Sequence, residues 1–535
     1  MSDPHLSAAD VSVVIPSGPG WERWEMLQMT LRGLARQSVS GFETVLAVDS
    51  RDEPPAGLGD VRVVVKPDRG PGPRRNAGAR AATRPIVLLL GDDTIPGPDL
   101  VAHHVGEHAR HPEAEVAVLG HIDWHPDVRR GRLERWLDWS RTQFDYPAEA
   151  VDDAGFGRFY SSNISLKRSF FLDVGGFDEE FGFGYEDTDL GLRLHHKGLR
   201  IRYQPAARAE HLHHYTWDAL RRRFSLVGEG EYLMTKKHPG FEPFFLERIL
   251  NRRRAPWWLP WPWLVELVPE AQGDEGPGRT RRLRRELEAR ADAWYYARLT
   301  GDFVTGWVLA AEADERRQYR HQTHGESTGP GEIAPATSLG APSDADRVDA
   351  ERWAARGLAE MRSLVPKGAR VLDVGDEVRP GSNGLRLLSD GYDVSFAGLS
   401  EGASSYLRWR LERRGLASSV HDGPVQSVPG TFDAAYACAE DGSAPDGPTL
   451  DALEARASLV IVRVTERAHG GTATVEGLFE RAGSGLVRYR RLGGHHLVAY
   501  RPGSGRPRNP VAAAVRRFRG RALPAKRAWY PDPRW

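Results

Sequence analysis

Cysteine is nearly absent from this chain. Cys438 is the single one among 535 residues, which excludes an intramolecular disulfide framework. A lone thiol suits the reducing cytoplasm, where we expect the protein. An excess of one charge is also missing, because 73 Lys and Arg residues balance 73 Asp and Glu residues. This balance argues against a uniformly basic nucleic-acid-binding protein and against an acidic solvating one.

Long apolar runs are missing as well. The longest stretches, such as residues 85–90, are far shorter than the ~20 residues that a membrane-spanning helix needs. Residues 1–10 are polar and lack the basic and apolar regions of a secretory signal. We therefore expect a soluble or peripherally attached protein. The hydrophobic content of 40% is sufficient for packed cores, and the length suggests about three folding units.

Short β-branched runs alternate with helical patterns in the first hundred residues. Strands are expected at 11–16, 44–48, 61–65 and 86–90, and helices at 24–37 and 76–82. This alternation predicts an α/β sheet that binds ligands at the carboxyl ends of its strands. Asp49, Asp92 and Asp93 follow two of these strands, so they are candidate binding residues.

Composition divides the rest of the chain. Residues 325–343 are rich in Gly, Pro, Ser and Thr, which is typical of a linker. A strand expected at 369–374 opens a second α/β unit. The residues after 501 hold nine basic side chains and one acid, a net +8, so residues 1–501 sum to −8. We predict an α/β domain over 1–240, a helical extension over 241–322, a linker over 323–345, a second α/β domain over 346–501 and a basic tail over 502–535.

Five motifs appear in a characteristic order: VSVVIPS, VLAVDS, PGPRRNAGARAA, IVLLLGDDTIPGPDLV and SSNISLKRSFFLDVGGFDEEFGFGYEDTDLGLRL, closing near HLHH. Their order and spacing resemble those of family 2 glycosyltransferases of the GT-A fold. The GGFDE and GYEDTDLG segments resemble the C-terminal motif of galactosyl- and N-acetylgalactosaminyltransferases, which favours a UDP-linked donor. The resemblance implies metal-dependent, inverting transfer of a hexose from a nucleotide-diphosphate sugar to a hydroxyl of a glycan or similar acceptor.

The resemblance also implies which residues bind the donor: Pro16, Asp49, Arg75, Asn76 and Asp92. Asp49 would accept a hydrogen bond from the base, and Arg75 would lie beside the base and phosphates. Asp92 would face the ribose. The family often has two acids where this chain has Asp49-Ser50, so one contact is missing. A solvated surface charge is the alternative for Arg75.

Asp93 matches the metal-ligating position of the family's DxD-type motif, although Gly91 replaces the first acid. Hard divalent cations prefer carboxylate oxygens, and Mn²⁺ or Mg²⁺ would bridge the donor phosphates. His211, after a strand expected at 200–204, would complete the site, with His213 as the alternative ligand. A polar surface histidine, or an acidic turn that caps the helix after Pro98, would explain the same residues without a metal.

Glu186 and Asp187 match the family's catalytic acid pair. Asp187 would take the proton from the acceptor hydroxyl, and Glu186 would bind sugar hydroxyls. The alternative is an ordinary helix capped by Asp187 or Asp189.

The second α/β unit resembles the cofactor half of class I methyltransferases that use S-adenosylmethionine (SAM), from ARVLDVGDEV onward. The family's glycine-rich turn has become Gly375-Asp376-Glu377, and the acid that holds the ribose is replaced by Gly398. These changes predict weak or no SAM binding. Asp373 and Gly375 are the residues that matter if binding survives.

The sequence does not decide which partners contact the tryptophan cluster of residues 257–263 and the basic tail of residues 502–535. The tryptophans of residues 257–263 could form a wall for the acceptor, a peripheral membrane anchor or a packed flap. The tail could contact anionic lipid, a polyanionic glycan or a protein, or remain solvated. Two rival functions also stay open: a bifunctional glycosyltransferase and methyltransferase, and a catalytically silent glycan- or nucleotide-binding protein.

Overall fold

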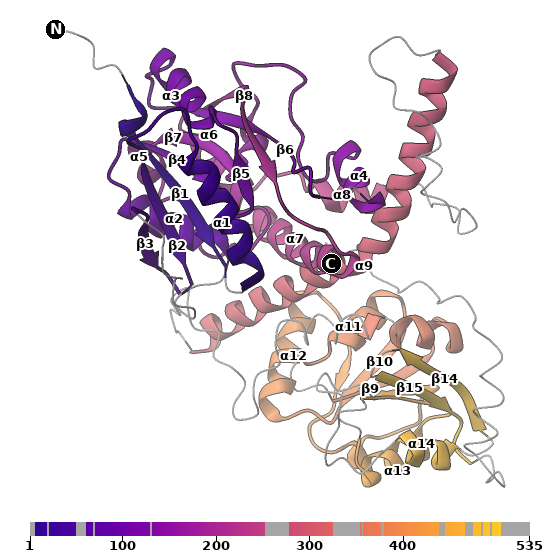
Figure 1. Ribbon diagram of the computed structural model, residues 1–535. Coiled ribbons are helices and arrows are strands. Elements are labelled where there is room, and N and C mark those ends of the chain that lie inside the picture. The colour runs from indigo at the N-terminus through magenta and orange to yellow at the C-terminus, as the bar shows by residue number, and fades with distance from the viewer. Residues whose placement is uncertain are drawn as a thin grey trace. The chain divides into compact units, whose positions relative to one another are not determined.

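The computed structural model describes residues 6–18, 21–49, 60–67, 70–128, 131–251, 278–324, 354–355, 357–375, 379–437, 445–465, 475–482, 485–492 and 495–503 (Figure 1). The chain forms two compact units, Met1–Trp307 and Val308–Trp535. The division falls inside one long helix, α9 (Gly278–His324). The tryptophans of residues 257–263, the expected linker and nearly all of the basic tail lie outside the described residues.

The first unit is built on an eight-stranded mixed sheet in the order β3-β2-β1-β4-β7-β6-β8-β5. The first four strands in this order are parallel, β7 is antiparallel to both neighbours, and β5 is antiparallel to β8. Their bounds are β1 (Val11–Ser17), β2 (Glu43–Val48), β3 (Arg62–Val65), β4 (Ile86–Leu90), β5 (Thr94–Pro96), β6 (Val116–Trp124), β7 (Asn163–Lys167) and β8 (Arg200–His211).

Helices cover both faces of this sheet because alternate residues of its central strands are apolar on both sides. Val13 and Ile15 of β1 pack with α1 (Trp21–Ala35) and α3 (Leu100–Arg110). Val14 packs into the opposite cluster, with α2 (Pro71–Ala81), α5 (Arg168–Asp173) and α6 (Glu186–His195). The α/β layers expected from the sequence are therefore confirmed for this unit.

Element boundaries differ from the expectation in two places that matter for the site. Helix α2 begins at Pro71 instead of residue 76, because proline suits the first helical turn and Gly70 adopts a φ of 84° before it. Strand β8 continues to His211, because its residues 208–211 pair with 121–124 of β6 beyond a register shift. His211 is therefore the last residue of a strand.

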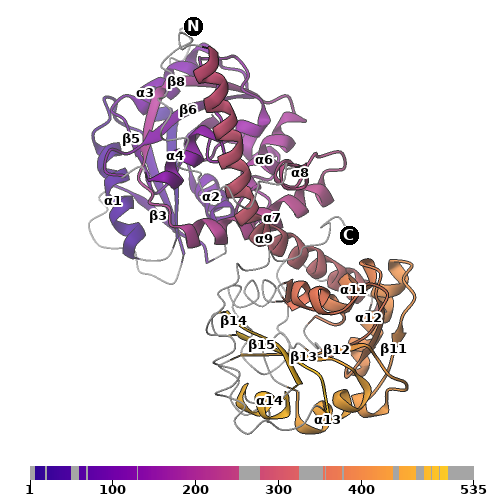
Figure 2. The ribbon, with the colours of Figure 1, turned by 90° about the vertical axis from the view of Figure 1, so that its right-hand side faces the viewer.

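Helix α7 (Trp217–Lys237) lies between α9 and the loop that precedes α6 (Figure 2). A Cβ added at Gly228 would be 2.0 Å from the carbonyl oxygen of Phe303 on α9. One added at Gly230 would be 2.1 Å from the carbonyl oxygen of Gly184. Glycine is required at both positions because two backbones approach α7 directly.

The start of α9 lies within the helical extension expected over 241–322. Ala291 is 2% exposed, but Leu283 is 51% exposed, so the first turns of α9 do not pack through Leu283. The face that packs begins closer to Ala291, where Trp136 donates a hydrogen bond to Asp292 at 3.2 Å.

The second unit contains a seven-stranded sheet in the order β11-β10-β9-β12-β13-β15-β14, in which β15 is antiparallel to both neighbours. Its strands are β9 (Arg370–Val374), β10 (Asp393–Ala397), β11 (Ser419–Val420), β12 (Ala434–Ala437), β13 (Val460–Thr465), β14 (Leu486–Leu492) and β15 (His495–Tyr500). Its helices include α11 (Ser382–Ser389), α12 (Glu401–Arg413), α13 (Gly447–Arg456) and α14 (Val475–Ala482). A second α/β unit is therefore confirmed.

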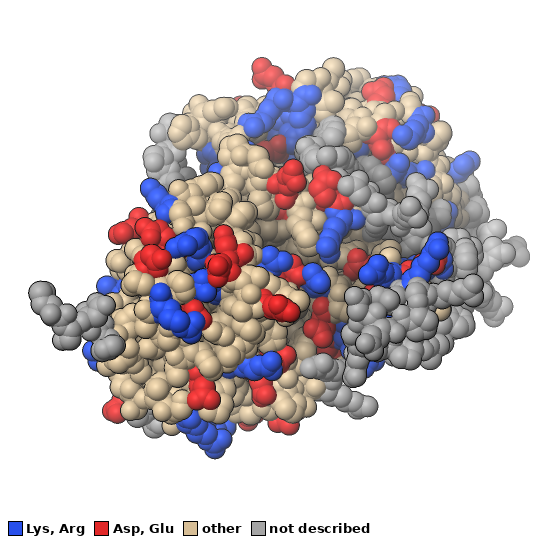
Figure 3. Space-filling view, turned by 90° about the horizontal axis from the view of Figure 1, so that it is seen from above, with Lys and Arg blue, Asp and Glu red and all other residues tan. Residues whose placement is uncertain are grey.

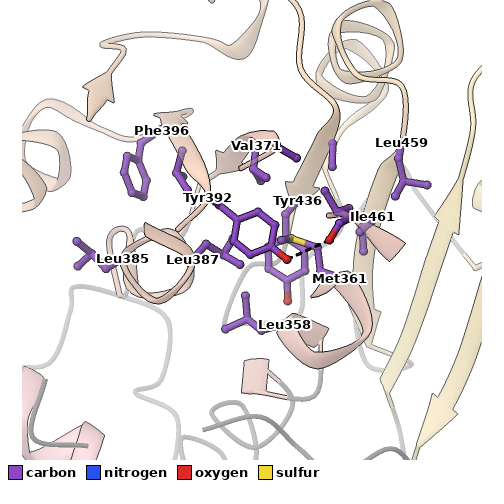
Figure 4. Packing of buried hydrophobic residues seen from close by; sticks show 14 of the residues in the cluster. Leu358, Met361, Val371, Leu385, Leu387, Tyr392, Phe396, Tyr436, Leu459 and Ile461 are labelled. Atoms are coloured by element: carbon purple, nitrogen blue, oxygen red, sulfur yellow. Dashed lines mark hydrogen bonds between the residues drawn. The ribbon is translucent and has the colours of Figure 1, made fainter. Parts of the chain in front are cut away.

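One core of this unit surrounds a buried tyrosine. Tyr392 donates a hydrogen bond to the carbonyl oxygen of Val365 at 3.0 Å, among Leu358, Met361 and Tyr436 (Figure 4). Burying the ring with its hydroxyl paired avoids the cost of an unsatisfied polar group.

Acidic and basic side chains are interspersed on the face shown in Figure 3, with neither sign gathered into one area. Among the described helices, none is both long and apolar enough to cross a bilayer.

Candidate active site

The candidate site lies at the carboxyl ends of β1, β2 and β4. The strand order reverses between β1 and β4, and such reversals open a crevice in α/β sheets. Pro16 and Ser17 end β1, Asp49 follows β2, and Asp92 follows β4. The side chains of Ser17, Asp49 and Asp92 are all buried. The fold thus brings together residues that the motifs place far apart in sequence.

Asp92 is held by an arginine that the sequence reasoning missed. Nη1 of Arg23, on α1, lies 2.7 Å from each carboxylate oxygen, and Ser17 Oγ donates to Oδ2 at 3.1 Å. Burial raises the pKa of Asp92, and Arg23 opposes that shift. The helix after Pro98 is preceded by Asp99 as its N-cap residue, so the interpretation of Asp92 and Asp93 as its caps is wrong.

Asp93 lies beside both histidines considered from the sequence. Its Oδ2 is 3.6 Å from His211 Nε2 and 3.5 Å from His213 Nδ1. Antiparallel pairing of β5 with β8 places Thr94 opposite His211 and so produces this arrangement. Although burial opposes it, the two histidines hold the pKa of Asp93 well below its usual range. Within the described ranges, no group of three or more His, Cys, Asp or Glu side chains is already arranged around a metal position.

Arg75 and Asn76 enter the site from α2. Arg75 is 7% exposed, so the alternative of a solvated surface charge is wrong. Its Nη1 lies 3.7 Å from Glu186 Oε1, and its guanidinium lies over the Phe177 ring at 5.5 Å. Within the described part of the chain, Nε and Nη1 of Arg75 have no hydrogen-bond partner. The guanidinium therefore has donors available for an anionic ligand.

Asn76 is engaged by the protein itself. Its amide donates to the carbonyl oxygen of Phe177 at 2.9 Å and accepts from the Phe177 N–H at 2.8 Å. These two bonds attach α2 to the glycine-rich loop before α6. The described contacts thus make Asn76 an anchor of that loop, whereas the motif match predicts a donor contact.

Glu186 and Asp187 form the first turn of α6. Tyr185 is the N-cap residue, so the alternative in which Asp187 or Asp189 caps the helix is wrong. Asp189 instead pairs with Arg193 and His238, each at 2.7 Å. It is held by the protein.

The Asp187 carboxylate is fixed on one side and available on the other. Oδ2 accepts a hydrogen bond from the Ser161 backbone N–H at 3.0 Å. Oδ1 is buried and has no hydrogen-bond partner among the described residues. Burial raises the pKa of Asp187, and Arg75 opposes the shift. Burial, together with the adjacent Asp187, raises the pKa of Glu186 to about 7. A poised carboxylate of this kind can accept a proton.

Arg74 was also missed from the sequence. It is buried beside Arg75, and burial lowers its pKa while Asp49 and Asp92 oppose the shift. The signal was present in the Arg-Arg-Asn run, but the motif match assigned a role to only one of the two arginines. Arg23 carried no comparable signal, because it lies 69 residues before Asp92.

In the second unit, the strand order reverses between β9 and β12. Asp373 at the end of β9 accepts a hydrogen bond from the Gly384 N–H at 2.9 Å. Gly375 and Gly398 have positive φ angles of 49° and 72°. Asp376 and Glu377 lie outside the described residues.

Comparison with known proteins matches residues 8–225 to the family model described as "Glycosyltransferase like family 2". A glucosyl-dolichyl phosphate glucuronosyltransferase of Haloferax volcanii is 29% identical over 225 residues, covering 38% of this chain and 68% of that protein. A validoxylamine A glucosyltransferase of Streptomyces hygroscopicus subsp. jinggangensis is 33% identical over 224 residues, covering 35% of this chain and 52% of that protein. A pre-mycofactocin glycosyltransferase of Mycobacterium tuberculosis is 30% identical over 237 residues, covering 44% of this chain and 49% of that protein. The chain thus spans about half the length of the last two relatives.

Proposed function

Because residues 8–225 match the family model described as "Glycosyltransferase like family 2", we propose that this enzyme transfers a hexose from a nucleotide-diphosphate sugar to a hydroxyl of a glycan or similar acceptor. Two of the similar proteins are named for glucosyl or glucuronosyl transfer, which supports a six-carbon sugar. The proposed donor is UDP-linked, the proposed fold is GT-A, and the proposed outcome is inversion at the anomeric carbon.

The observation that carries this proposal is the state of Asp187. One oxygen is fixed by the Ser161 N–H, and the other is buried with no described partner. In the reaction, the acceptor oxygen forms a bond to the anomeric carbon while the bond from that carbon to the donor phosphate breaks. Asp187 takes the acceptor proton as this happens. Arg75, whose Nε and Nη1 have no hydrogen-bond partner among the described residues, would stabilise the charge that develops on the leaving diphosphate.

Asp93 is the candidate ligand for a divalent cation. One nitrogen of each of two imidazoles lies within 3.6 Å of its carboxylate, and carboxylate together with substrate phosphate oxygens suits Mn²⁺ or Mg²⁺. Asp93 and His211 would hold the ion, with His213 as the alternative to His211. When bound, the ion supplies Lewis-acid stabilisation of the departing diphosphate. Asp92, already compensated by Arg23, would remain for the ribose.

The test is transfer or donor hydrolysis with a panel of UDP-sugars in the presence of Mn²⁺. Asp187→Asn is expected to lower turnover roughly 100-fold or more, because the proton acceptor is lost. Asp93→Ala is expected to lower turnover and weaken its dependence on Mn²⁺. Asp152→Asn, at an 88% exposed side chain, is the matched control and should behave as wild type. Wild-type turnover in the first two variants would show that the mechanism is wrong.

For the second unit we propose a methyltransferase-like α/β domain that does not bind SAM. The support is that Asp373 already accepts a backbone hydrogen bond and that Gly398 offers no side chain to the ribose. Calorimetric titration of the whole protein with millimolar SAM is expected to show no heat of binding. Saturable binding would favour the bifunctional alternative instead.

A further inference from the structure

Tyr185, the residue before Glu186 and Asp187, has a left-handed backbone. Its φ is 82° and its ψ is −10°. Among the described non-glycine residues, Tyr185 and Arg141 are the two with positive φ. This conformation is unfavourable for a residue with a Cβ, so contacts around it must hold it in place. A tyrosine at a position that suits glycine therefore indicates that its side chain is used.

The hydroxyl of Tyr185 donates a hydrogen bond to Oε1 of Glu231, on α7. Burial and the adjacent Glu231 raise the pKa of Tyr185 well above its usual value, which keeps the hydroxyl protonated as a donor. Its ring lies edge-on to Phe241 and Phe245, with centroids 5.9 and 6.5 Å away. The side chain is thus fixed at its tip and along its ring.

Glu231 is fully buried, and its carboxylate binds a second element. Its oxygens accept hydrogen bonds from the backbone N–H groups of Phe245 at 2.8 Å and Leu246 at 2.9 Å. These groups belong to the first turn of α8 (Phe244–Asn251), where N–H groups have no partner within the helix. A carboxylate at this end also interacts favourably with the helix dipole.

The neighbouring residue of α7 contacts the same loop. Gly230 approaches the carbonyl oxygen of Gly184 so closely that a Cβ would be 2.1 Å from it. Two consecutive residues of α7 therefore contact the two residues that lead into Glu186. The entry to α6 is determined by α7 as well as by the local sequence.

We propose that Glu231 is a positioning residue for the reaction: through Tyr185 it sets the first turn of α6 and hence the place of the Asp187 carboxylate. This inference rests on the proposed function, because Asp187 is the proposed base. Glu231 also joins the start of α8 to that turn, so α7, α8 and α6 meet at one buried carboxylate.

The test compares two variants. Tyr185→Phe removes the hydroxyl that donates to Glu231, and Glu231→Gln replaces one accepting oxygen with an NH₂ group that faces hydrogen-bond donors. Each is expected to lower kcat about ten- to hundredfold, since a misplacement of ~1 Å costs up to about 10²-fold in rate. The KM for the donor is expected to stay within about twofold of wild type, because donor-binding groups are unchanged. Tyr232→Phe is the control, because it removes a tyrosine hydroxyl from the residue that follows Glu231 on α7. The Tyr232 ring lies edge-on to Trp307, with centroids 5.6 Å apart, and this variant should leave kcat unchanged.

Amide hydrogen exchange supplies a readout that does not need turnover. Tyr185→Phe is expected to speed exchange in residues 185–190 alone, and Glu231→Gln both there and in the first turn of α8. Wild-type kcat and exchange in Tyr185→Phe would overturn the proposal, as would an effect of Glu231→Gln confined to α8. If wild-type protein transfers no sugar from any donor, the proposed function fails, and the exchange pattern still decides whether Glu231 positions α6.

Discussion

Two adjacent buried carboxyl groups, Glu186 and Asp187, share the neighbourhood of one guanidinium, that of Arg75. Burial favours the protonated form of each carboxyl, and Arg75 favours the ionised form. The pair therefore titrates as a unit, with protons leaving in two coupled steps. Because the pKa of Glu186 is raised to about 7, the charge of this pair changes near neutral pH.

This coupling predicts the direction of a pH effect. A general base acts when ionised, so kcat/KM is expected to rise with pH through an apparent pKa above the ordinary carboxyl range of about 4. Glu186→Gln removes the neighbouring negative charge, so this acid limb should move to lower pH. A pH–rate profile of both proteins measures the shift. Glu286→Gln, at a largely exposed side chain on α9, is the control. A limb that stays in place, or moves to higher pH, would contradict the coupling.

At the level of single residues, the motif matches named the carboxylates that we place in the candidate site but few of their partners. Asp92 was found because it follows a buried strand. Arg23 was not found, because its contact with Asp92 exists only in the folded sheet, where β1 pairs with β4. The role of Tyr185 was invisible for a similar reason, since a left-handed φ at a tyrosine leaves no trace in composition or spacing.

At the scale of secondary-structure elements, a buried ion cluster joins Glu312, near the end of α9, to two arginines of the second unit. Glu312 accepts hydrogen bonds from Arg379 at 2.6 Å and Arg410 at 3.3 Å, and all three side chains are nearly inaccessible. Although burial opposes it, the arginines hold the pKa of Glu312 well below its usual range. The stabilisation that this shift represents is present above the ordinary carboxyl pKa. It is lost as pH falls through the folded-state pKa.

Glu312→Ala is expected to destabilise the second unit by about 3–5 kcal/mol, because two buried arginines lose their shared acceptor. The free energy of unfolding is measured by denaturant titration of the whole protein, with hydrogen exchange in β9 and α12 as the probe of the second unit. Glu286→Ala, on the same helix and exposed, should have little effect. Equal stability of the Glu312→Ala protein and the wild type would contradict the assigned role of this cluster.

The elements also show where sequence patterns stop being informative. The four strands expected between residues 11 and 90 match β1 to β4 within about a residue, because β-branched runs between turn residues are a strong signal. The extension of β8 to His211 was missed, because it depends on pairing with β6 past a register shift. The close contacts of Gly228 and Gly230 were missed too, because glycines within a helix indicate neither their partner nor their purpose.

For the whole molecule, two α/β units share one chain, and the family match covers only the first. The proposed mechanism therefore concerns that unit, where we propose that Asp187 accepts the acceptor proton in a single displacement at the anomeric carbon. The stereochemistry of the product tests this claim without reference to the identity of the acceptor.

The decisive measurement is proton NMR of the first glycoside formed from a UDP-α-hexose, before any mutarotation of free sugar. A single displacement with Asp187 as base predicts a β-linked product in the wild type and its loss in Asp187→Asn. An α-linked product, or an unchanged rate of β-linked product in Asp187→Asn, would contradict the proposed mechanism.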